Sequence, residues 1–203
     1  MLDRLLIVGA LGAETLPFLR ALHQPRPLSP RLVTGQLSGQ SVAVLTCGVG
    51  PAKASRRVTA ALPLWDAAAI VSIGTCGGLI DALAVGTVVT ASRLLEEDTE
   101  CPAPLPWPDI PHATIVTVSR GVFTASRRAV LAARGGTVCE MEAAAVQRAA
   151  GDLPFSTLKV VSDLAGGAAD DPPPRPGPLD IGRFMALALK LSSEKLLPTL
   201  TRG

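Results

Sequence analysis

Aromatic side chains and histidines are scarce in this chain of 203 residues, which holds four Phe, two Trp, no Tyr and two His. Proteins that bind single-stranded nucleic acid stack bases on aromatic side chains, and this chain has few to offer. Its net charge of +2 also gives no basic excess to attract a phosphate backbone. We therefore expect no nucleic-acid partner.

The cysteines are too scattered for a metal site. The four cysteines form no C-x-x-C pair, and the two histidines lie apart from them, so the usual zinc spacings are missing. Cys47, Cys76 and Cys139 each have apolar or small neighbours in the sequence. We expect no metal, and buried free thiols in a reducing cytoplasm rather than disulfides.

Long apolar runs are missing as well. No stretch of about 18 uncharged apolar residues occurs, because Asp66 interrupts the longest candidate, so we expect no contact with a membrane. The apolar run 5–13 could imitate a signal peptide, but Asp3 precedes it and no clear polar cleavage region follows. We interpret it as a first strand.

What the chain does contain is an alternation of strand-like and helix-like segments. Its length suits one domain over residues 1–203. Apolar runs and β-rich patterns predict strands over 4–9, 33–39, 41–47, 69–74, 85–92, 113–119 and 156–162. Helical periodicity predicts helices over 13–22, 51–62, 139–150 and 181–200. The alternation indicates an α/β fold with a largely parallel or mixed central sheet.

Two proline-rich stretches interrupt this pattern. Residues 101–108 can propagate neither a helix nor a central strand, so they should form a surface loop. Residues 171–178 are also rich in proline. They are interpreted as a stiff connector or as a lid over a site, with the connector favoured.

The most informative feature is a pair of carboxylates, Glu140 and Glu142, in an alanine-rich run that should begin a buried helix. Carboxylates are almost never fully buried without a partner, so a polar partner such as a ligand is expected there. The alternative is that one Glu caps the helix N-terminus, where the helix dipole favours anions, while the other faces water.

Other candidate site residues follow the predicted strands, because ligands of open α/β sheets collect at the carboxyl ends of strands. The segments in question are 9–14, 47–51, 74–78 and 162–163. Their glycines could simply permit tight turns, and 74–78 is expected to be such a turn. The sequence has neither a G-x-G-x-x-G with a downstream acid nor a P-loop, so no dinucleotide or P-loop chemistry is supported.

Taken in order, these segments resemble the nucleoside phosphorylase and nucleosidase superfamily, and most closely the bacterial 5′-methylthioadenosine/S-adenosylhomocysteine nucleosidases. The specific part is Glu-Met-Glu at 140–142, followed about twenty residues later by Ser-Asp at 162–163. Further matches are 7–10 with Glu14, 47–50, 74–79, and Phe184, Lys190, Ser192 and Ser193 in the last helix. The resemblance implies a three-layer sandwich with a mixed central sheet, no cofactor, and a homodimer.

The resemblance also implies cleavage of the N-glycosidic bond of a purine nucleoside, through a ribosyl cation that carboxylates stabilise. By resemblance, Asp163 donates a proton to the purine N7, Glu14 activates the attacking water, and Glu142 binds the ribose 2′- and 3′-hydroxyls. From the residues alone, Asp163 could instead cap a helix or loop, and Glu14 could be an ordinary first-turn charge.

The same resemblance suggests further substrate-binding residues, any of which could be ordinary core. They line the sugar and its 5′ substituent, bracket the base, or support the acids: Leu11, Val49, Thr75, Phe123, Thr124, Glu140, Met141 and Ser162.

The reaction and the substrate are left partly open. Phosphorylases of the hexameric branch carry an arginine where this chain has Ser72, which favours water as the nucleophile, although Arg20 or Arg120 could substitute. Region 97–118, which commonly helps form the 5′ pocket, is shorter than in the family. Relatives acting on futalosine or adenosylhopane therefore remain alternatives, as does a non-catalytic nucleoside-binding protein.

Overall fold

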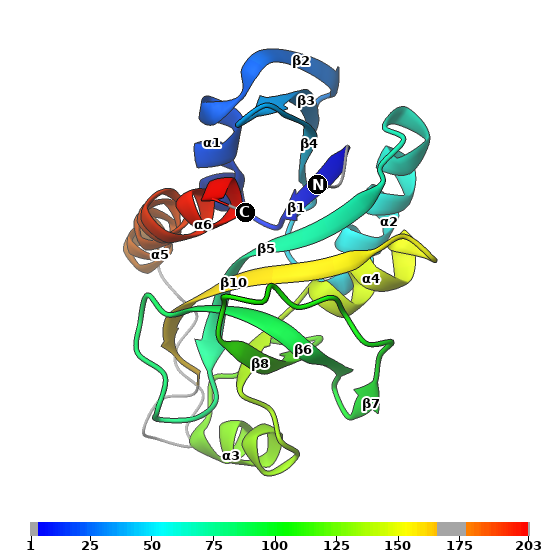
Figure 1. Ribbon diagram of the computed structural model, residues 1–203. Helices are drawn as coiled ribbons and strands as arrows, with labels where there is room; N and C mark the ends of the chain where they lie inside the picture. Colours follow the sequence, from blue (N-terminus) through cyan, green and yellow to red (C-terminus); the bar gives the residue numbers. More distant parts are fainter. Residues whose placement is uncertain (1–3, 166–177, 203) are drawn as a thin grey trace.

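The computed structural model describes residues 4–165 and 178–202 of the chain. Ten strands within these residues form one mixed sheet, in the order β10-β6-β8-β9-β5-β1-β4-β3-β2 with β7 paired to β6 (Figure 1). The strands are β1 (Leu5–Gly9), β2 (His23–Ser29), β3 (Leu32–Leu37), β4 (Gln40–Thr46), β5 (Ala69–Gly78), β6 (Val88–Glu96), β7 (Thr99–Glu100), β8 (His112–Thr117), β9 (Val138–Glu140) and β10 (Phe155–Leu164).

Half of the sheet closes on itself. Strand β10 pairs with β5 in parallel and with β6 in antiparallel fashion, so β5, β10, β6, β8 and β9 form a closed circuit. Strands β1, β4, β3 and β2 extend from β5 as the open half of the sheet. The central strands β4, β1, β5 and β10 run parallel to one another, so their carboxyl ends meet at one edge of the sheet.

Helices cover both faces of the sheet, which makes three layers (Figure 1). One layer contains α2 and α4, and the opposite layer contains α1, α5, η2 and α6. The helices are α1 (Gly12–Ala21), α2 (Pro51–Ala61), η1 (Leu62–Leu64), α3 (Ala125–Ala133), α4 (Ala143–Ala150), α5 (Pro178–Leu191), the π-helical turn η2 (Ser192–Leu196) and α6 (Leu197–Arg202). The predicted α/β class, a mixed sheet between helical layers, is confirmed.

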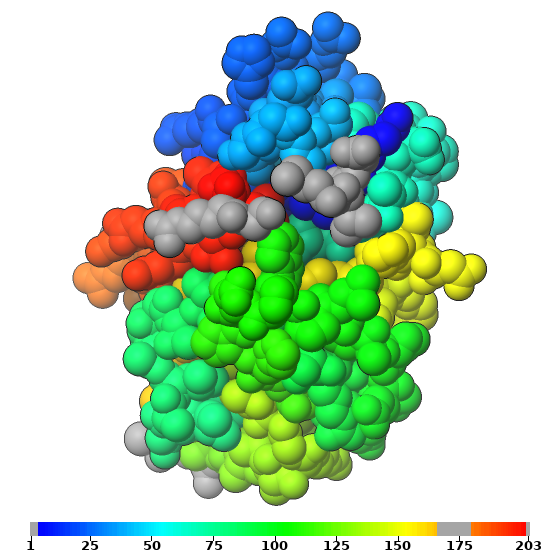
Figure 2. Space-filling view, in the orientation of Figure 1, coloured from blue at the N-terminus to red at the C-terminus, as the bar shows by residue number. Residues whose placement is uncertain are grey.

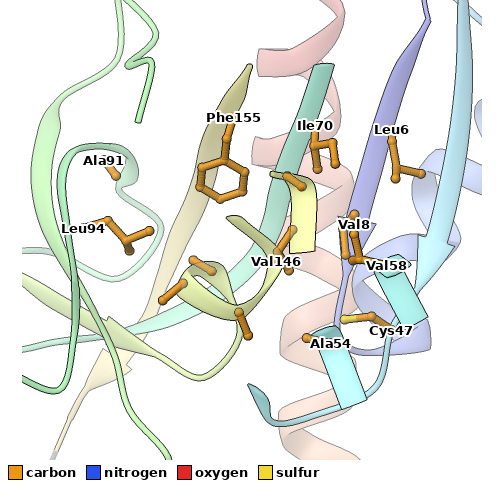
Figure 3. Packing of buried hydrophobic residues seen from close by; sticks show 14 of the residues in the cluster. Leu6, Val8, Cys47, Ala54, Val58, Ile70, Ala91, Leu94, Val146 and Phe155 are labelled. Atoms are coloured by element: carbon orange, nitrogen blue, oxygen red, sulfur yellow. The ribbon is translucent and has the colours of Figure 1, made fainter. Parts of the chain in front are cut away.

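Strand β1 shows why a continuous apolar run marks a central strand. Leu6 and Val8 pack on one face, in the cluster that includes Val58 of α2 (Figure 3). Leu5 and Ile7 pack on the other face, in the cluster that includes Phe18 of α1. Successive side chains of a strand point to opposite faces, so a strand buried on both faces is apolar throughout.

The predicted tight turn over 74–78 is wrong, because strand β5 continues through this segment to Gly78. The strand bends at Gly74, whose φ of 140° lies in a region that glycine adopts without a steric penalty. Beyond the bend the chain keeps pairing with β10 and β9. The glycines therefore allow a bent strand, and no chain reversal occurs there.

The predicted helix over 139–150 begins four residues later than expected. Residues Val138–Glu140 form the short strand β9, and α4 starts at Ala143 with Glu142 as its N-cap. The carboxylate of Glu140 accepts hydrogen bonds from the backbone N–H groups of Glu142 and Ala143, which fixes the start of the helix. The apolar pattern alone could not locate this local cap.

Three other expectations differ in detail. Strand β2, which carries two prolines at the exposed edge of the sheet, and helix α3 were not predicted. The predicted closing helix 181–200 is interrupted by the π-helical turn η2. The strand expected at 85–92 runs from Val88 to Glu96.

The loop expected at 101–108 lies at the surface, in the green part of Figure 2, and within it Pro104 is buried. Leu105 anchors it by donating its backbone N–H to the carbonyl of Phe155, 2.8 Å away. Of the proline-rich stretch 171–178, predicted as connector or lid, residues 171–177 lie outside the described residues, and Pro178 is the first residue of α5.

Candidate active site

A cavity of about 490 Å³ opens at the carboxyl ends of β1, β5 and β10. Four connecting segments and helix α5 complete its walls: the loop before α1, the loop before α2, the segment between β8 and α3, and the junction between β9 and α4. Glu14, Glu142 and Asp163, which come from three distant parts of the chain, all line it. The other predicted residues in its walls are Leu11, Val49, Thr75, Phe123, Glu140, Met141 and Ser162.

Glu14 is the most firmly held of the acids. It lies in the first turn of α1 and is 3% exposed. Its Oε2 accepts hydrogen bonds from the backbone N–H groups of Ala10 (3.1 Å) and Leu11 (2.9 Å). Its Oε1 accepts from the N–H (2.8 Å) and the hydroxyl (2.9 Å) of Thr75 on β5. Four donors thus fix the orientation of this carboxylate at the cavity wall.

Glu142 is the N-cap of α4, and its Oε1 accepts a 2.7 Å hydrogen bond from the backbone N–H of Gly50. Burial raises the pKa of this carboxyl, and the neighbouring charge of Glu140 raises it further, to about 7. Lys159 and the Gly50 N–H act in the opposite direction, and Glu14 adds a smaller upward push. The group therefore titrates close to neutral pH.

Glu140 has a different environment from the one expected of a substrate-binding residue. Its Oε1 accepts from the Thr117 hydroxyl (2.6 Å), and its Oε2 lies 3.1 Å from the ammonium of Lys159. Both oxygens also accept backbone N–H bonds at the start of α4. Protein donors thus contact both oxygens, so Glu140 supports the α4 N-terminus, and its assignment to substrate binding stays a prediction.

Lys159 was missed at the sequence level, although one signal was present. It is a lysine between Leu158 and Val160 in the buried middle of a strand, where a charge is costly unless it is paired. The side chain is fully enclosed, and the residue is 1% exposed. Its partners, Glu140 and Ser72, are distant in the sequence, which is why no local pattern identifies them.

Asp163 lies near the end of β10 at the mouth of the cavity and is exposed. The register of β10 shifts between Val161 and Asp163, a bulge that changes the direction of the following side chain. Ser162 Oγ lies 2.5 Å from Asp163 Oδ1 and 3.2 Å from the carbonyl oxygen of Cys76. The Ser162 hydroxyl is therefore placed to orient the carboxyl of Asp163.

The remaining walls are apolar. Leu11, Val49, Phe123 and Met141 are joined by three side chains of α5 that were not assigned to the site: Ile181, Phe184 and Leu187. Phe123 is 56% exposed, so it is not the plain core residue that was the alternative.

Thr124 does not line the cavity. Its hydroxyl caps α3 by accepting from the N–H of Arg127, so its assignment to base binding is not supported. A base-binding role for its backbone has no support in the geometry either.

The charged residues described in the cavity wall are all acidic. Among the described residues that line it are five carboxyl side chains, including Asp180, and no Lys, Arg or His. Arg20, one of the two proposed phosphate ligands, lines a separate groove between α1 and α5. Arg120, the other, is exposed and does not line the cavity. Neither arginine is placed to hold a phosphate beside these acids.

The thiols near the cavity are unreactive. All four cysteines are free, and Cys47, Cys76 and Cys139 are buried. Burial, with smaller contributions from nearby carboxylates, raises the pKa of Cys47 and of Cys139 to about 12. These thiols stay protonated at neutral pH and offer no nucleophile.

The described part of the chain shows neither a metal-ligand cluster nor a helix that could span a membrane. No group of three or more His, Cys, Asp or Glu side chains in 4–165 and 178–202 is arranged to hold a metal ion. None of the helices in these ranges has the length and apolar character needed to cross a membrane.

Comparison with known proteins gives consistent results. The family model described as "Phosphorylase superfamily" matches residues 4–116. A 5′-methylthioadenosine/S-adenosylhomocysteine nucleosidase from Shewanella sediminis is 26% identical over 197 residues, covering 78% of this chain and 85% of the relative.

Solved structures show the same fold. The nucleosidase of that name from Colwellia psychrerythraea, in complex with adenine, superposes with a TM-score of 0.80 at 21% identity and covers 98% of this chain and 95% of the other. A futalosine hydrolase mutant from Helicobacter pylori gives a TM-score of 0.77 at 16% identity, over 99% of this chain and 100% of the other.

Proposed function

Because the chain belongs to the phosphorylase superfamily, we propose that it is an N-ribosyl hydrolase of purine nucleosides, acting on 5′-methylthioadenosine or S-adenosylhomocysteine and releasing adenine. The observation that carries this proposal is the meeting of Glu14, Glu142 and Asp163 in one largely apolar cavity. Acids from three distant segments have no structural reason to share an apolar cavity. Stabilisation of a ribosyl cation supplies a chemical reason.

The proposed mechanism divides the work among these acids. Asp163, at the mouth and oriented by Ser162, protonates N7 of the purine as the base departs. Glu142 accepts hydrogen bonds from the ribose 2′- and 3′-hydroxyls in its ionised form. Glu14, held by its four donors, orients water on the opposite face of the sugar and takes its proton.

The apolar residues of the cavity fit the rest of the substrate. Phe123 offers an exposed aromatic face to a purine, and Leu11, Val49 and Met141 suit the sugar and its 5′ substituent. Ile181, Phe184 and Leu187 of α5 extend this apolar wall.

Water is favoured over phosphate as the nucleophile. A phosphate dianion would enter a cavity whose described walls carry five carboxyl groups and no basic side chain. The negative charges of these carboxylates would repel a phosphate dianion, whereas a neutral water molecule binds without a cationic partner.

The second candidate function is futalosine hydrolysis. It is favoured by the similarity to a Helicobacter pylori futalosine hydrolase over 99% of the chain. The two functions share the acid pattern and differ in the group bound at the 5′ position of the sugar. We further propose a cytoplasmic homodimer, as for the family that the sequence resembles.

The test is a panel of substrates with and without phosphate. The purified chain is incubated with methylthioadenosine, adenosylhomocysteine, futalosine and inosine, and the free base is measured by chromatography. Release of adenine without phosphate is expected. Release that depends on phosphate would overturn the hydrolase assignment, and no release from any nucleoside would overturn the enzyme assignment.

A further inference from the structure

Lys159 is a fully buried cation that lies behind the cavity rather than in its wall. Its ammonium donates to Ser72 Oγ at 3.0 Å and to the carbonyl oxygen of Ile73 at 3.3 Å, both on β5. It also forms an ion pair with Glu140 Oε2 at 3.1 Å. Its three protons therefore all have acceptors, and the side chain holds β10, β5 and the end of β9 together.

Hydrogen bonds to Glu140 connect this ion pair to the first turn of α4. Glu140 accepts from the N–H groups of Glu142 (3.0 Å) and Ala143 (2.9 Å). Thr117 donates its hydroxyl to Glu140 and accepts from the N–H of Ala144 at 3.0 Å. Because these bonds fix where α4 begins, they also fix where its N-cap, Glu142, enters the cavity.

The other two contacts of Lys159 lead toward Glu14. Ser72 and Ile73 immediately precede Gly74, where β5 bends, and Thr75, which donates twice to Glu14. One buried ammonium thus supports the strand that anchors Glu14 and the helix start that carries Glu142.

The charges around Lys159 are otherwise negative. Glu140 from β9, Glu142 from α4 and Glu14 from α1 all act on it, and the thiols of Cys47 and Cys76 lie within its field. Burial alone lowers the pKa of this ammonium, but the three carboxylates together raise it above its usual value. Lys159 therefore stays charged and is a permanent counter-ion for the carboxylates of the cavity.

We propose that Lys159 is a positioning residue for the reaction: its ion pair with Glu140 keeps Glu142 in place for the ribose, and its charge offsets that of Glu140 beside Glu142, while Lys159 itself touches no substrate. This inference rests on the proposed function of the same cavity. It goes beyond that function by assigning an effect on Glu142 to a buried cation that lies behind the cavity wall.

The test compares two substitutions that change this charge in opposite senses. In Lys159→Met the cation that lowers the pKa of Glu142 is lost, so the acidic limb of the kcat/KM profile should move to higher pH by about one unit or more. In Glu140→Gln the anion that raises the same pKa is lost while the shape is kept, so the limb should move to lower pH.

Two controls accompany these variants. Lys159→Arg keeps the charge and should leave the limb in place. Lys195→Met removes a lysine that is exposed on η2 and should also leave it unchanged. Loss of packing alone would lower kcat/KM equally at every pH, so limbs that coincide in Lys159→Met, Glu140→Gln and the native protein would overturn the inference.

A second measurement separates this inference from the proposed function. In protein labelled with ¹³C at the glutamate carboxyl carbons, the titration of Glu142 is followed by NMR and assigned with Glu142→Gln. This readout needs no turnover. If the native protein releases no base, the proposed function fails alone; if Glu142 titrates at the same pH in the native protein and in Lys159→Met, the role of Lys159 fails. Should Lys159→Met not fold, Lys159→Gln, which also removes the charge but keeps a polar side chain for Ser72 and Glu140, is measured in its place.

Discussion

Replacing Gly74 by alanine tests whether the orientation of Glu14 controls turnover. A Cβ at position 74 would lie 2.9 Å from Glu14 Oε1, 3.0 Å from its Cδ and 3.1 Å from its Oε2. The carboxylate cannot swing aside freely, because the Ala10, Leu11 and Thr75 donors hold it. It must shift by a few tenths of an ångström at the expense of those bonds.

The magnitude follows from two separable effects. The φ of 140° at Gly74 is strained for alanine and costs about 1–3 kcal/mol of stability. Weakening one hydrogen bond to the charged carboxylate costs roughly 2 kcal/mol more. Displacement of a catalytic group by up to 1 Å costs as much as about 10²-fold in rate, so we expect kcat/KM to fall roughly ten- to a hundredfold.

Gly39→Ala is the matched control. Gly39 also has a positive φ, 82°, but a Cβ there meets nothing within 4 Å. It should lose stability through strain alone and keep its activity. Adenine release and urea unfolding are measured for both variants. If Gly74→Ala retained kcat/KM within about twofold, or if both variants lost the same activity, the argument that Glu14 must be held in place would be refuted.

Three further changes give expected outcomes. Asp163→Asn removes the proposed general acid and should lower kcat by about 10²–10⁴-fold with an unchanged unfolding midpoint, as measured by adenine release and circular dichroism; near-normal turnover would exclude Asp163 from the mechanism. The pKa of Glu142 is raised to about 7 in the folded protein, whereas the unfolded chain releases this proton at about pH 4.3. Between these values the folded protein binds more protons than the unfolded chain. The free energy of unfolding should therefore fall as pH rises from about 5 to 7. Urea unfolding across this range should lose that slope in Glu142→Gln, and a retained slope would contradict the assignment. Thr117→Val breaks the relay between Glu140 and the N–H of Ala144 and should destabilise the protein by about 1–3 kcal/mol in the same assay, whereas an unchanged stability would show that the relay is dispensable.

The parts of the fold that could be predicted are those that the hydrophobic pattern encodes locally. Strand β1 is apolar throughout because both faces are buried, and the run 4–9 located it to within a residue. Strand β2 could not be found in this way. Its prolines at 25 and 27 argue against a strand, and only its place at the exposed edge of the sheet permits them.

The residues of the candidate site also differ in whether a local sequence pattern marks them. Apolar runs marked the segments that hold Glu14 and Asp163, because the carboxyl ends of neighbouring parallel strands meet at one edge, and the family resemblance singled out the two acids within them. Lys159 was missed because its role depends on a hydrogen bond to Ser72, 87 residues away, and on an ion pair with Glu140 in another strand. Partners that far apart meet only through the topology of the sheet, which composition and periodicity do not specify.

The two glutamates of the Glu-Met-Glu motif show how backbone geometry gives identical side chains different roles. Were both residues inside one helix, as expected, their side chains would point about 200° apart and one would face water. Instead Glu140 ends a strand and is turned toward Lys159, while Glu142 caps the next helix and is turned toward Gly50. Since protein groups occupy both oxygens of Glu140, its charge acts on the reaction only through Glu142. A substrate in this cavity would meet a Glu142 carboxylate bonded through Oε1 to Gly50, and a Glu140 carboxylate whose two oxygens are already bonded to Thr117, Lys159 and the start of α4.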